Sequence, residues 1–234
     1  MLAVAAIAAV ISLTHDASGA TGCIAYDNSS KAIMVACNAT FSDIINSNVS
    51  GFVLHGNTTS KEWTLDADLR VGEGATLSIT QNDVSWLKVT GAHGIIVNGR
   101  LQMEGVKVTS WDAKTQSVIL QEHMGSIKRA FIQLNGSDGG WIRNSDIGYL
   151  GEVEPGKRGI DLYGAFPSHG FSIVGSKIHN MFHAIHTVQA YNITIKDSEF
   201  YDNIGYTVDP HSGSQDIKII GNHVHDNKGI GIIC

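Results

Sequence analysis

The residues with the clearest potential for chemistry lie in the hexapeptide Tyr206-Thr-Val-Asp-Pro-His211. Asp209 and His211 are two residues apart at the end of a short apolar run, so in a strand their side chains project from the same face. Pro210 lacks a backbone N–H and has a fixed φ, so regular pairing is expected to end there. A carboxylate beside an imidazole on a stiff backbone can act as an acid–base pair. The alternative is a simple strand-ending turn, in which Asp and Pro are both common.

A sequence repeat indicates the elements that position this motif. Segment 192–203 aligns with 216–227 at a spacing of 24, and segment 171–180 aligns with 193–202 at a spacing of 22. Apolar residues coincide at alternate positions, and Trp141-Ile-Arg-Asn-Ser-Asp-Ile147 is a weaker copy. A period in the low twenties with this alternation is typical of a parallel β-solenoid, and the pattern of leucine-rich repeats is absent. The predicted fold is therefore all-β, a right-handed parallel β-helix with coils of about 22–24 residues.

The repeat also divides the chain. Residues 1–20 are predicted to be a signal peptide or N-terminal anchor, residues 21–70 a capping segment without the period, and residues 71–234 the β-helix. The insertion 151–158 is expected to form a loop beside the groove that carries the motif. Because the chain ends within an apolar run, either it belongs to a longer protein or its last coil pairs with another surface. Less regular early coils are predicted at 75–79, 86–89, 94–97 and 101–108.

Composition narrows the class of protein. The 26 glycines, 3 prolines and 16% charged residues fit a turn-dense β protein, and 234 residues can bury a substantial core in one domain or two small ones. The net charge of −6 and the lack of a Lys/Arg cluster exclude nucleic acid as a partner. An acidic polysaccharide stays open, because it needs only a local basic or histidine-lined groove.

The N-terminus predicts export. Residues 2–13 form a run of twelve that is apolar except for Ser12, too short to span a bilayer, and the small residues 17–20 follow it. We expect cleavage before Ala20 or Thr21 and a secreted or cell-surface protein. No Lys or Arg precedes the run, so an uncleaved anchor is the alternative, and no other transmembrane span is predicted.

Cysteines and glycosylation motifs agree with export. Cys23 and Cys37, fourteen residues apart, can form a disulfide in an exported chain and would be two unpaired thiols otherwise. Cys234 has no predicted partner. Asn-x-Ser/Thr motifs, each a weak signal for glycosylation, begin at Asn28, Asn38, Asn48, Asn57, Asn135 and Asn192.

Coil stacking brings further residues to the motif, because equivalent positions of successive coils lie about 4.8 Å apart. One coil earlier are His183 and His186, and one coil before that is the segment Lys157-Arg158-Gly-Ile-Asp161-Leu-Tyr163. A face with an Asp, several histidines, a Tyr and an Arg is therefore predicted. Tyr206 has the opposite parity to Asp209 and is expected to reach this face only if a bulge at the proline re-aims the strand.

Other polar residues are given structural roles. His179, His223 and His225 are predicted to be solvated corners or satisfied surface histidines, and the Asn/Asp rows at 180, 202–203 and 226–227 to bond along the stack. His223-Val-His225-Asp226 lacks a fixed third or fourth metal ligand, so no metal site and no cofactor are predicted. Calcium between carboxylates of adjacent coils is the one cation left open.

Over residues 105–234 the chain resembles the alginate (mannuronan) C5-epimerases, β-helix enzymes that act on polymannuronate. The resemblance rests on Tyr206-x-x-Asp-Pro-His211, Val108-Thr-Ser-Trp-Asp112, Ser145-Asp-Ile-Gly-Tyr-Leu-Gly151 and Asn222-His-Val-His-Asp-Asn227. It implies that Tyr206, Asp209 and His211 are catalytic. The chain departs from the family pattern at Thr207, where the family has glycine, and at Ser212, where it has an acidic residue. The additional His and Arg of the periplasmic branch have no clear counterpart: Ile204 stands where the His is expected, and the chain ends before the Arg.

The resemblance implies a definite chemistry. Epimerisation removes the C5 proton, which is α to a carboxylate, and returns a proton to the other face of the ring. His211 and Tyr206 are the candidates for base and acid, and Asp209 for their orienting group. Arg158, His183 and His186 are the candidates for binding and neutralising the substrate carboxylate. A lyase, in which the C4 substituent leaves, and a non-catalytic carbohydrate-binding or structural surface protein are the alternatives. The expected partner is an acidic polysaccharide or cell-surface glycan.

Overall fold

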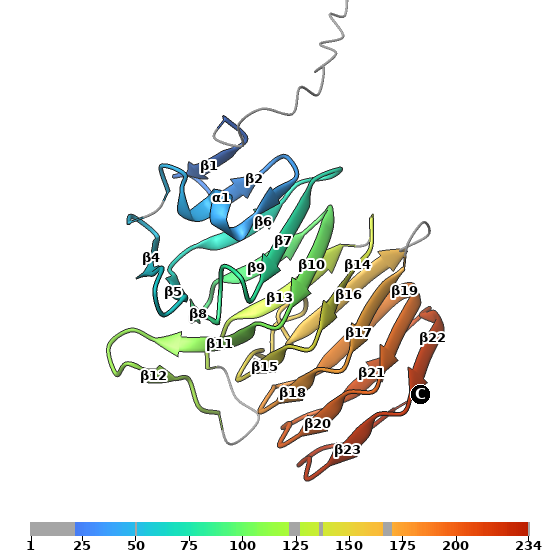
Figure 1. Ribbon diagram of the computed structural model, residues 1–234. Coiled ribbons are helices and arrows are strands. Elements are labelled where there is room, and N and C mark those ends of the chain that lie inside the picture. Colours follow the sequence, from blue (N-terminus) through green and yellow to red (C-terminus); the bar gives the residue numbers. More distant parts are fainter. Residues whose placement is uncertain (1–21, 50, 122–126, 136–137, 166–169, 234) are drawn as a thin grey trace, which may run out of the picture.

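A computed structural model describes residues 22–49, 51–121, 127–135, 138–165 and 170–233, and shows a right-handed stack of coils with three strand-bearing faces in these ranges (Figure 1). The predicted signal segment and Cys234 lie outside the described residues. Within each coil the chain crosses the first, second and third face in turn, and the strands of each face pair in parallel with those of the neighbouring coils. The all-β fold class predicted from the repeat is therefore confirmed.

The first face consists of β2 (Ala32–Val35), β6 (Asp68–Val71), β9 (Gly94–Val97), β13 (Phe131–Asn135), β16 (Ile160–Ala165), the start of β19 (Ile185–Lys196) and β21 (Val208–Pro210). The second face consists of β3 (Ala39–Thr40), β7 (Thr76–Thr80), β10 (Arg100–Glu104), β14 (Gly140–Arg143), β17 (Phe171–Val174), the end of β19 and β22 (Gln215–Ile220). The third face consists of β5 (Glu62–Leu65), β8 (Trp86–Thr90), β11 (Lys107–Asp112), β15 (Asp146–Gly148), β18 (Lys177–His179), β20 (Glu199–Tyr201) and β23 (His223–His225).

The strand register reproduces the sequence alignment. Ile193 pairs with Ile217, and Phe200 pairs with Val224, as the spacing of 24 requires. Phe171 pairs with Ile193 at the spacing of 22. The alternating apolar side chains point into the solenoid, where Phe171, Ile193 and Phe200 are almost fully buried. The four early coil segments predicted upstream correspond to β7, β8, β9 and the pair β10–β11.

Corners of the coils use residues that tolerate left-handed backbone. Between the second and third faces, Asn144 (φ 48°) and Asp197 (φ 49°) occupy the same place as glycines in other coils. Behind this corner, buried hydroxyls form a ladder in which the amide of Ser145 donates to Ser176 Oγ and that of Ser176 donates to Ser198 Oγ, both at 3.2 Å. Polar residues that recur at one position of each coil thus form hydrogen bonds with one another along the stack, as predicted for the Asn/Asp rows.

The Asn rows behave in the same way. The side-chain amide of Asn203 donates to Asn227 Oδ1 at 2.9 Å, and Asn203 Oδ1 accepts from the amide of Met181 at 3.0 Å. His179, His223 and His225 were predicted to be solvated corners or satisfied surface histidines. They lie in strands β18 and β23 rather than at corners, with His223 exposed, His225 half-buried and His179 buried. The left-handed corner residues are instead Asn180 and Asp226, immediately after those strands.

The N-terminal segment joins the stack rather than lying wholly above it. β2 pairs in parallel with β6, and β5 pairs in parallel with β8, so the first coil begins inside residues 21–70. The short helix α1 (Phe41–Ile45) interrupts the strand period there. Three further strands, β1 (Ile24–Asp27), β4 (Leu54–Asn57) and β12 (Ser117–Val118), pair antiparallel as hairpin partners.

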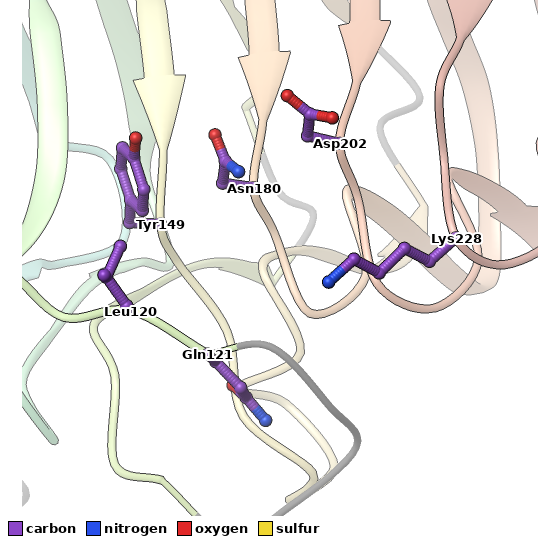
Figure 2. Close-up of a pocket in the computed structure, with 6 residues that line it drawn as sticks. All are labelled: Leu120, Gln121, Tyr149, Asn180, Asp202 and Lys228. Atoms are coloured by element: carbon purple, nitrogen blue, oxygen red, sulfur yellow. The ribbon is translucent and has the colours of Figure 1, made fainter.

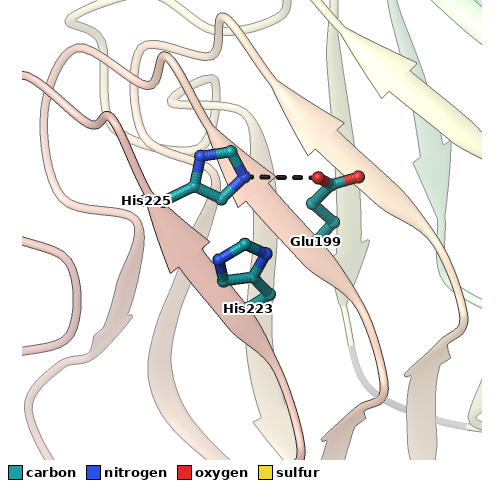
Figure 3. A group of neighbouring side chains, drawn as sticks. All are labelled: Glu199, His223 and His225. Carbon is teal, nitrogen blue, oxygen red and sulfur yellow. Dashed lines mark hydrogen bonds and ion pairs between the residues drawn. The ribbon is translucent and has the colours of Figure 1, made fainter.

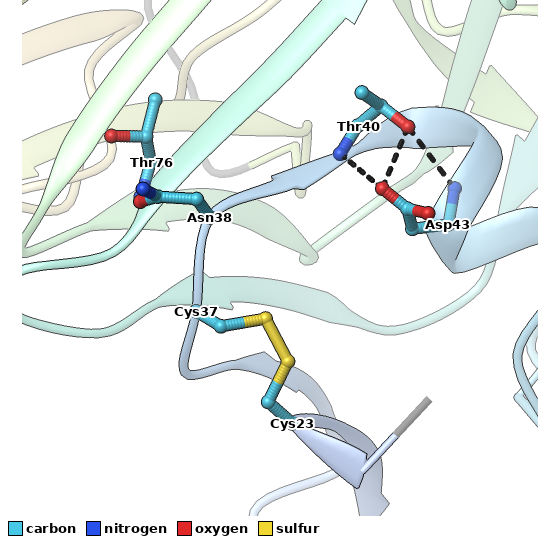
Figure 4. The surroundings of a disulfide bond; sticks show 6 residues. All are labelled: Cys23, Cys37, Asn38, Thr40, Asp43 and Thr76. Carbon is cyan, nitrogen blue, oxygen red and sulfur yellow. Dashed lines mark hydrogen bonds between the residues drawn. A yellow bond between two sulfur atoms is a disulfide. The ribbon is translucent and has the colours of Figure 1, made fainter. Parts of the chain in front are cut away.

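Figure 4 shows how this segment is fastened. Cys23 and Cys37 form the predicted disulfide, with Cα atoms 5.8 Å apart. Thr40 caps α1: its Oγ1 accepts from the amide of Asp43, whose carboxylate accepts in return from the amide of Thr40 at 2.7 Å. Asn38 Oδ1 accepts from the amide of Thr76 in the next coil at 2.9 Å. Within the described ranges no helix is both long and apolar enough to cross a membrane.

Candidate functional site

The Asp-Pro-His motif lines a pocket on the first face. The pocket has a volume of about 480 Å³, and residues from four successive coils surround it. Its lining consists of Val153, Arg158, Phe182, His183, Ile204, Gly205, Tyr206, Asp209, His211, Gly229 and Ile230. Arg158, His183, Tyr206, Asp209 and His211 were all candidates from the sequence, so the structure brings these residues to one cavity.

The strand register explains this gathering. Asp161 of β16 pairs with His186 of β19, and His186 pairs with Asp209 of β21. These three residues therefore form one row across three coils, and their side chains point to the same side of the sheet. β21 ends at Pro210, as predicted, although the amide of His211 still donates to Thr187 O at 2.9 Å.

Asp161, His186 and Arg158 form a hydrogen-bonded group behind the pocket. His186 Nδ1 is 2.7 Å from Asp161 Oδ1, and His186 Nε2 is 2.8 Å from Arg158 Nη1. Asp161 Oδ2 accepts from the backbone amide of Arg158 at 2.6 Å. Because a guanidinium only donates, His186 Nε2 must accept, and its proton is on Nδ1, where Asp161 accepts it. The neutral imidazole thus holds the Arg158 side chain in place.

Burial makes this group rigid. Asp161 is 0% exposed and His186 is 3% exposed, whereas Arg158 is half-buried and reaches the pocket. His186 itself does not line the pocket. It was predicted to contact the substrate carboxylate, and the structure places it one layer behind, on the residue that does reach the cavity. Asp161 had been placed on this face from the sequence but given no function, because its link to Arg158 depends on a contact across coils.

His183 contributes a neutral ring to the pocket. Burial, with Arg158 and His186 nearby, lowers the pKa of His183 from 6.5 to about 4. Its Nδ1 is buried without a hydrogen-bond partner, and its ring lies 5.0 Å from that of Tyr206. Gly205 makes room for the ring, since a Cβ there would lie 2.7 Å from His183 Cδ2. At neutral pH the positive charge in this pocket therefore comes from Arg158, not from His183.

Two more buried polar atoms of the motif lack partners. Asp209 is 4% exposed and its Oδ2 has no hydrogen-bond partner, and neither has the hydroxyl of the fully buried Thr207. The predicted orienting contact from Asp209 to His211 or Tyr206 stays a prediction. The carboxylate that orients an imidazole beside this pocket is Asp161, through His186.

His211 is exposed and oriented by its neighbour. The amide of Ser212 donates to His211 Nδ1 at 2.7 Å, and Ser212 Oγ lies 2.8 Å from the same atom. Because a backbone N–H only donates, the neutral His211 ring carries its proton on Nε2. Ser212, which replaces the acidic residue expected from the family pattern, thus sets the tautomer of His211.

Tyr206 reaches the pocket without a bulge. β21 begins only at Val208 and pairs regularly with β19, so strand alternation does not apply to Tyr206. The expectation that a proline bulge is needed to re-aim Tyr206 was wrong for this reason. The insertion 151–158 forms the predicted loop beside the pocket, and supplies Val153 and Arg158 to its wall. A network of ion pairs anchors the loop: Lys128 contacts Glu152 and Glu154, and Lys157 contacts Glu154 at 2.8 Å.

A second pocket, of about 320 Å³, lies at the corner between the third and first faces (Figure 2). Its lining is Leu120, Gln121, Tyr149, Asn180, Asp202 and Lys228. The fully buried Arg129 lies behind it and donates to the backbone oxygens of Tyr149 and Asn180. Asn180 and Asp202 are successive members of the left-handed corner row, so this pocket follows from the corner geometry and carries no orphaned polar atom.

Comparison with known proteins agrees with the fold and with the resemblance. The family described as the right handed beta helix region matches residues 69–234. A mannuronan C5-epimerase of Pseudomonas putida is 24% identical over 169 residues, which are 68% of this chain and 32% of that protein. The mannuronan C5-epimerase AlgG of Azotobacter vinelandii is 22% identical over 182 residues, 73% of this chain and 34% of that protein.

The crystal structure of the periplasmic alginate epimerase AlgG superposes with a TM-score of 0.76 at 17% identity, and covers 85% of this chain and 49% of that chain. The chain thus spans about a third of the length of these curated relatives. The match at this identity concerns the fold. The chain therefore belongs to the right-handed β-helix family, and the curated proteins to which it is similar include mannuronan C5-epimerases.

Proposed function

We propose that this chain acts on an acidic polysaccharide as a C5-epimerase of polymannuronate or a related polyuronate. The observation that carries the proposal is the position of Arg158. Its guanidinium reaches the pocket that also contains Tyr206, Asp209 and His211, and Asp161 and His186 hold it there. A fixed cation beside an acid–base group is the arrangement needed to remove a proton α to a carboxylate.

Arg158 neutralises the substrate carboxylate. Removal of the C5 proton spreads negative charge onto that group, and a guanidinium can bind both of its oxygens. His183 is neutral at pH 7 because its pKa is about 4, and both ring nitrogens of His186 are occupied. Of the three candidates from the sequence, Arg158 is therefore the one that binds the charge, and His186 is a positioning residue.

His211 and Tyr206 move the proton. With Nδ1 occupied by the Ser212 amide, neutral His211 presents an N–H on Nε2, which suits the acid that reprotonates C5. Tyr206, as its phenolate, is then the base that removes the original proton from the other face of the ring and becomes the phenol. Exchange with solvent afterwards returns a proton to His211 and takes one from Tyr206. Asp209 Oδ2, buried and without a partner, accepts a hydrogen bond from a sugar hydroxyl. One proton leaves C5 and one returns, so the substrate keeps its formula.

Export is part of the proposal. The Cys23–Cys37 disulfide favours an oxidising compartment, and one matched relative is described as periplasmic. Glycosylation also stays a prediction, and four of the six acceptors, Asn28, Asn38, Asn48 and Asn57, are exposed.

Proton NMR of polymannuronate, and then of other polyuronates, incubated with the protein in D₂O tests the activity. Deuterium at C5 together with new guluronate signals is the expected result, and it should vanish in His211→Ala. His55→Ala, which removes an exposed histidine of β4, is the matched control and should keep full activity. Signals of a 4,5-unsaturated sugar would establish a lyase instead. Unchanged spectra with retained binding of the polymer would identify a carbohydrate-binding protein.

A further inference from the structure

Three metal-ligating side chains meet on the third face, away from the pocket of the first face. Glu199, His223 and His225 each direct one donor atom to a common point, and these atoms lie within 4.8 Å of one another (Figure 3). The strand register places them there. Glu199 of β20 pairs with His223 of β23, and His225 is two residues further along the same strand, so all three project from one side of the sheet.

His225 is already oriented in the way metal ligands are. Its Nδ1 is 2.8 Å from Asp226 Oδ2, and its Nε2 is 3.2 Å from Glu199 Oε1. A histidine that binds a metal through one nitrogen usually donates the other N–H to a carboxylate, which fixes the ring. Asp226 therefore has the position of this supporting carboxylate, and Nε2 is aimed at the centre of the cluster.

Glu199 has no close bond to a lysine. On the same face Glu62 is bound to Lys88 at 2.7 Å, and Asp146, like Glu199, is bound to a histidine, His179, at 2.7 Å. The lysine beside Glu199 is Lys177, and it stays at 3.6 Å, beyond hydrogen-bond distance. Apart from this loose ion pair, the partner of Glu199 is His225, a second potential ligand.

We propose that Glu199, His223 and His225 bind a divalent transition-metal ion of the zinc class. Two imidazoles and one carboxylate are a typical donor set for such ions, whereas calcium and magnesium prefer oxygen ligands alone. Ligands of one tetrahedral zinc ion lie about 3.4 Å apart, so the three side chains must rotate to close on it. His223 is exposed, and its ring, which stacks on His225 with 4.2 Å between centroids, turns out of this stack to bind the ion. A fourth position stays open for water.

The ion would join neighbouring coils. Glu199 belongs to the coil of His186, and the two histidines belong to the coil of Asp209 and His211. A metal bridge between β20 and β23 therefore clamps the coil that carries the motif to the preceding coil. We expect binding to raise the melting temperature, because an ion that binds only the folded state stabilises it.

Isothermal titration calorimetry and thermal unfolding of the untagged full chain with zinc chloride test the proposal. Cys234 is replaced by serine in all samples, because its thiol is a competing ligand. We expect one zinc ion per chain and a rise in melting temperature, with no rise from calcium chloride. His223→Ala and Glu199→Gln should remove this binding, and Asp226→Asn should weaken it about 10- to 100-fold.

His55→Ala, which removes an exposed histidine outside the cluster, should bind zinc like the parent. Far-UV circular dichroism of each variant verifies that it is folded, and Glu199→Gln retains the side-chain volume if His223→Ala fails to fold. Absence of zinc binding by the parent, or unchanged affinity in both Glu199→Gln and His223→Ala, would overturn the proposal. An equal response to calcium would also overturn it. Arg158→Ala should leave zinc binding intact, so the result is independent of the proposed epimerase activity.

Discussion

Two aspartate–histidine pairs on different faces of the solenoid have the same oxygen–nitrogen distance but different surroundings. On the first face Asp161 lies 2.7 Å from His186, and on the third face Asp146 lies 2.7 Å from His179. The remaining nitrogen of His186 faces a donor, Arg158, so the ring is neutral. The remaining nitrogen of His179 faces an acceptor, Asn180 Oδ1, at 2.7 Å. The Asp161–His186 pair holds the Arg158 guanidinium at the pocket, whereas the Asp146–His179 pair forms hydrogen bonds only with neighbouring polar residues of the third face and its corner.

The difference extends to the atoms around each pair. On the third face Tyr201 stacks between His179 and His225, with ring centroids 4.9 and 5.6 Å apart. Around the first pair, buried polar atoms of His183, Thr207 and Asp209 have no partner. Each such atom costs about 1–3 kcal/mol, and the described residues contain few others. Elsewhere the polar side chains of successive coils form hydrogen bonds with one another. Beside the pocket these atoms have no protein partner, and a bound substrate can supply the missing hydrogen bonds.

Replacing Arg158 by alanine should give the largest effect. The variant keeps the Asp161–His186 hydrogen bond but loses the cation, so we expect kcat for C5 exchange to fall about 10²- to 10³-fold. Deuterium exchange at C5 of polymannuronate measures this. Arg158→Lys should recover only part of the activity, because a lysine cannot bind the carboxylate with two parallel bonds. Full activity of Arg158→Ala would assign neutralisation to another residue.

Asp161→Asn and Asp146→Asn test the two pairs directly. An asparagine oxygen can accept from the Arg158 amide or from His186 Nδ1, not from both as the two carboxylate oxygens do. The loss of orientation should cost about 1–3 kcal/mol of stability and about 10²-fold in exchange rate. Nitrogen-15 NMR of the His186 ring should show the change of tautomer. Asp146→Asn should leave the exchange rate unchanged, and an equal loss in both variants would mean that only stability is involved.

Acid should distinguish the histidines of the two faces. The pKa of His183 is lowered to about 4, so below 6.5 the unfolded chain takes up a proton that the folded chain refuses. The stability linked to His183 is complete above pH 6.5 and is lost, by about 3 kcal/mol, as the pH falls to about 4. The half-buried His225 contributes with the opposite sign, because Asp226 and Glu199 raise its pKa, and its contribution to stability is lost as the pH rises.

Urea unfolding of the parent and of His183→Gln between pH 7 and pH 4 measures the part of the free energy of unfolding that is linked to His183. The difference between the two curves removes the contribution of the carboxyl groups. We expect the stability of the variant to fall less steeply with acid. Parallel curves would mean that His183 is protonated in the folded chain.

The fold was predictable from the sequence because it repeats. Ile193 and Ile217 occupy the same strand position, and the buried face of each strand fixes the register. The pocket was predictable in part, because Asp209 and His211 are two residues apart at the end of one strand and stacking brings His183 close to them. The first coil was not predictable from the sequence, because α1 and the hairpin β4–β5 interrupt the repeat there.

Contacts across coils account for what the sequence did not reveal. The insertion 151–158 shifts the spacing before β16, so the sequence alone does not place Arg158 against His186. The third ligand-type residue beside His223 and His225, Glu199, lies 24 positions before His223, and only the register brings them together. The sequence alignment already has this spacing of 24, so applying it to His223 would have identified Glu199 as its neighbour.

Ser212→Asp should change the rate of C5 exchange least, and the direction of the change is informative. In this chain the Ser212 amide donates to His211 Nδ1 and leaves the proton on Nε2. A carboxylate at position 212 would accept from Nδ1–H, move the proton there and leave the Nε2 lone pair free, so His211 would begin as the base instead of the acid. If Tyr206 is a poor base, this exchange of roles should increase the rate of C5 exchange several-fold. Ser212→Asn, which has a similar shape but no charge, is the control and should stay near the parent. A decrease in the rate for Ser212→Asp, with an unchanged melting temperature, would show that the Nε2 proton set by Ser212 is the one delivered to the sugar.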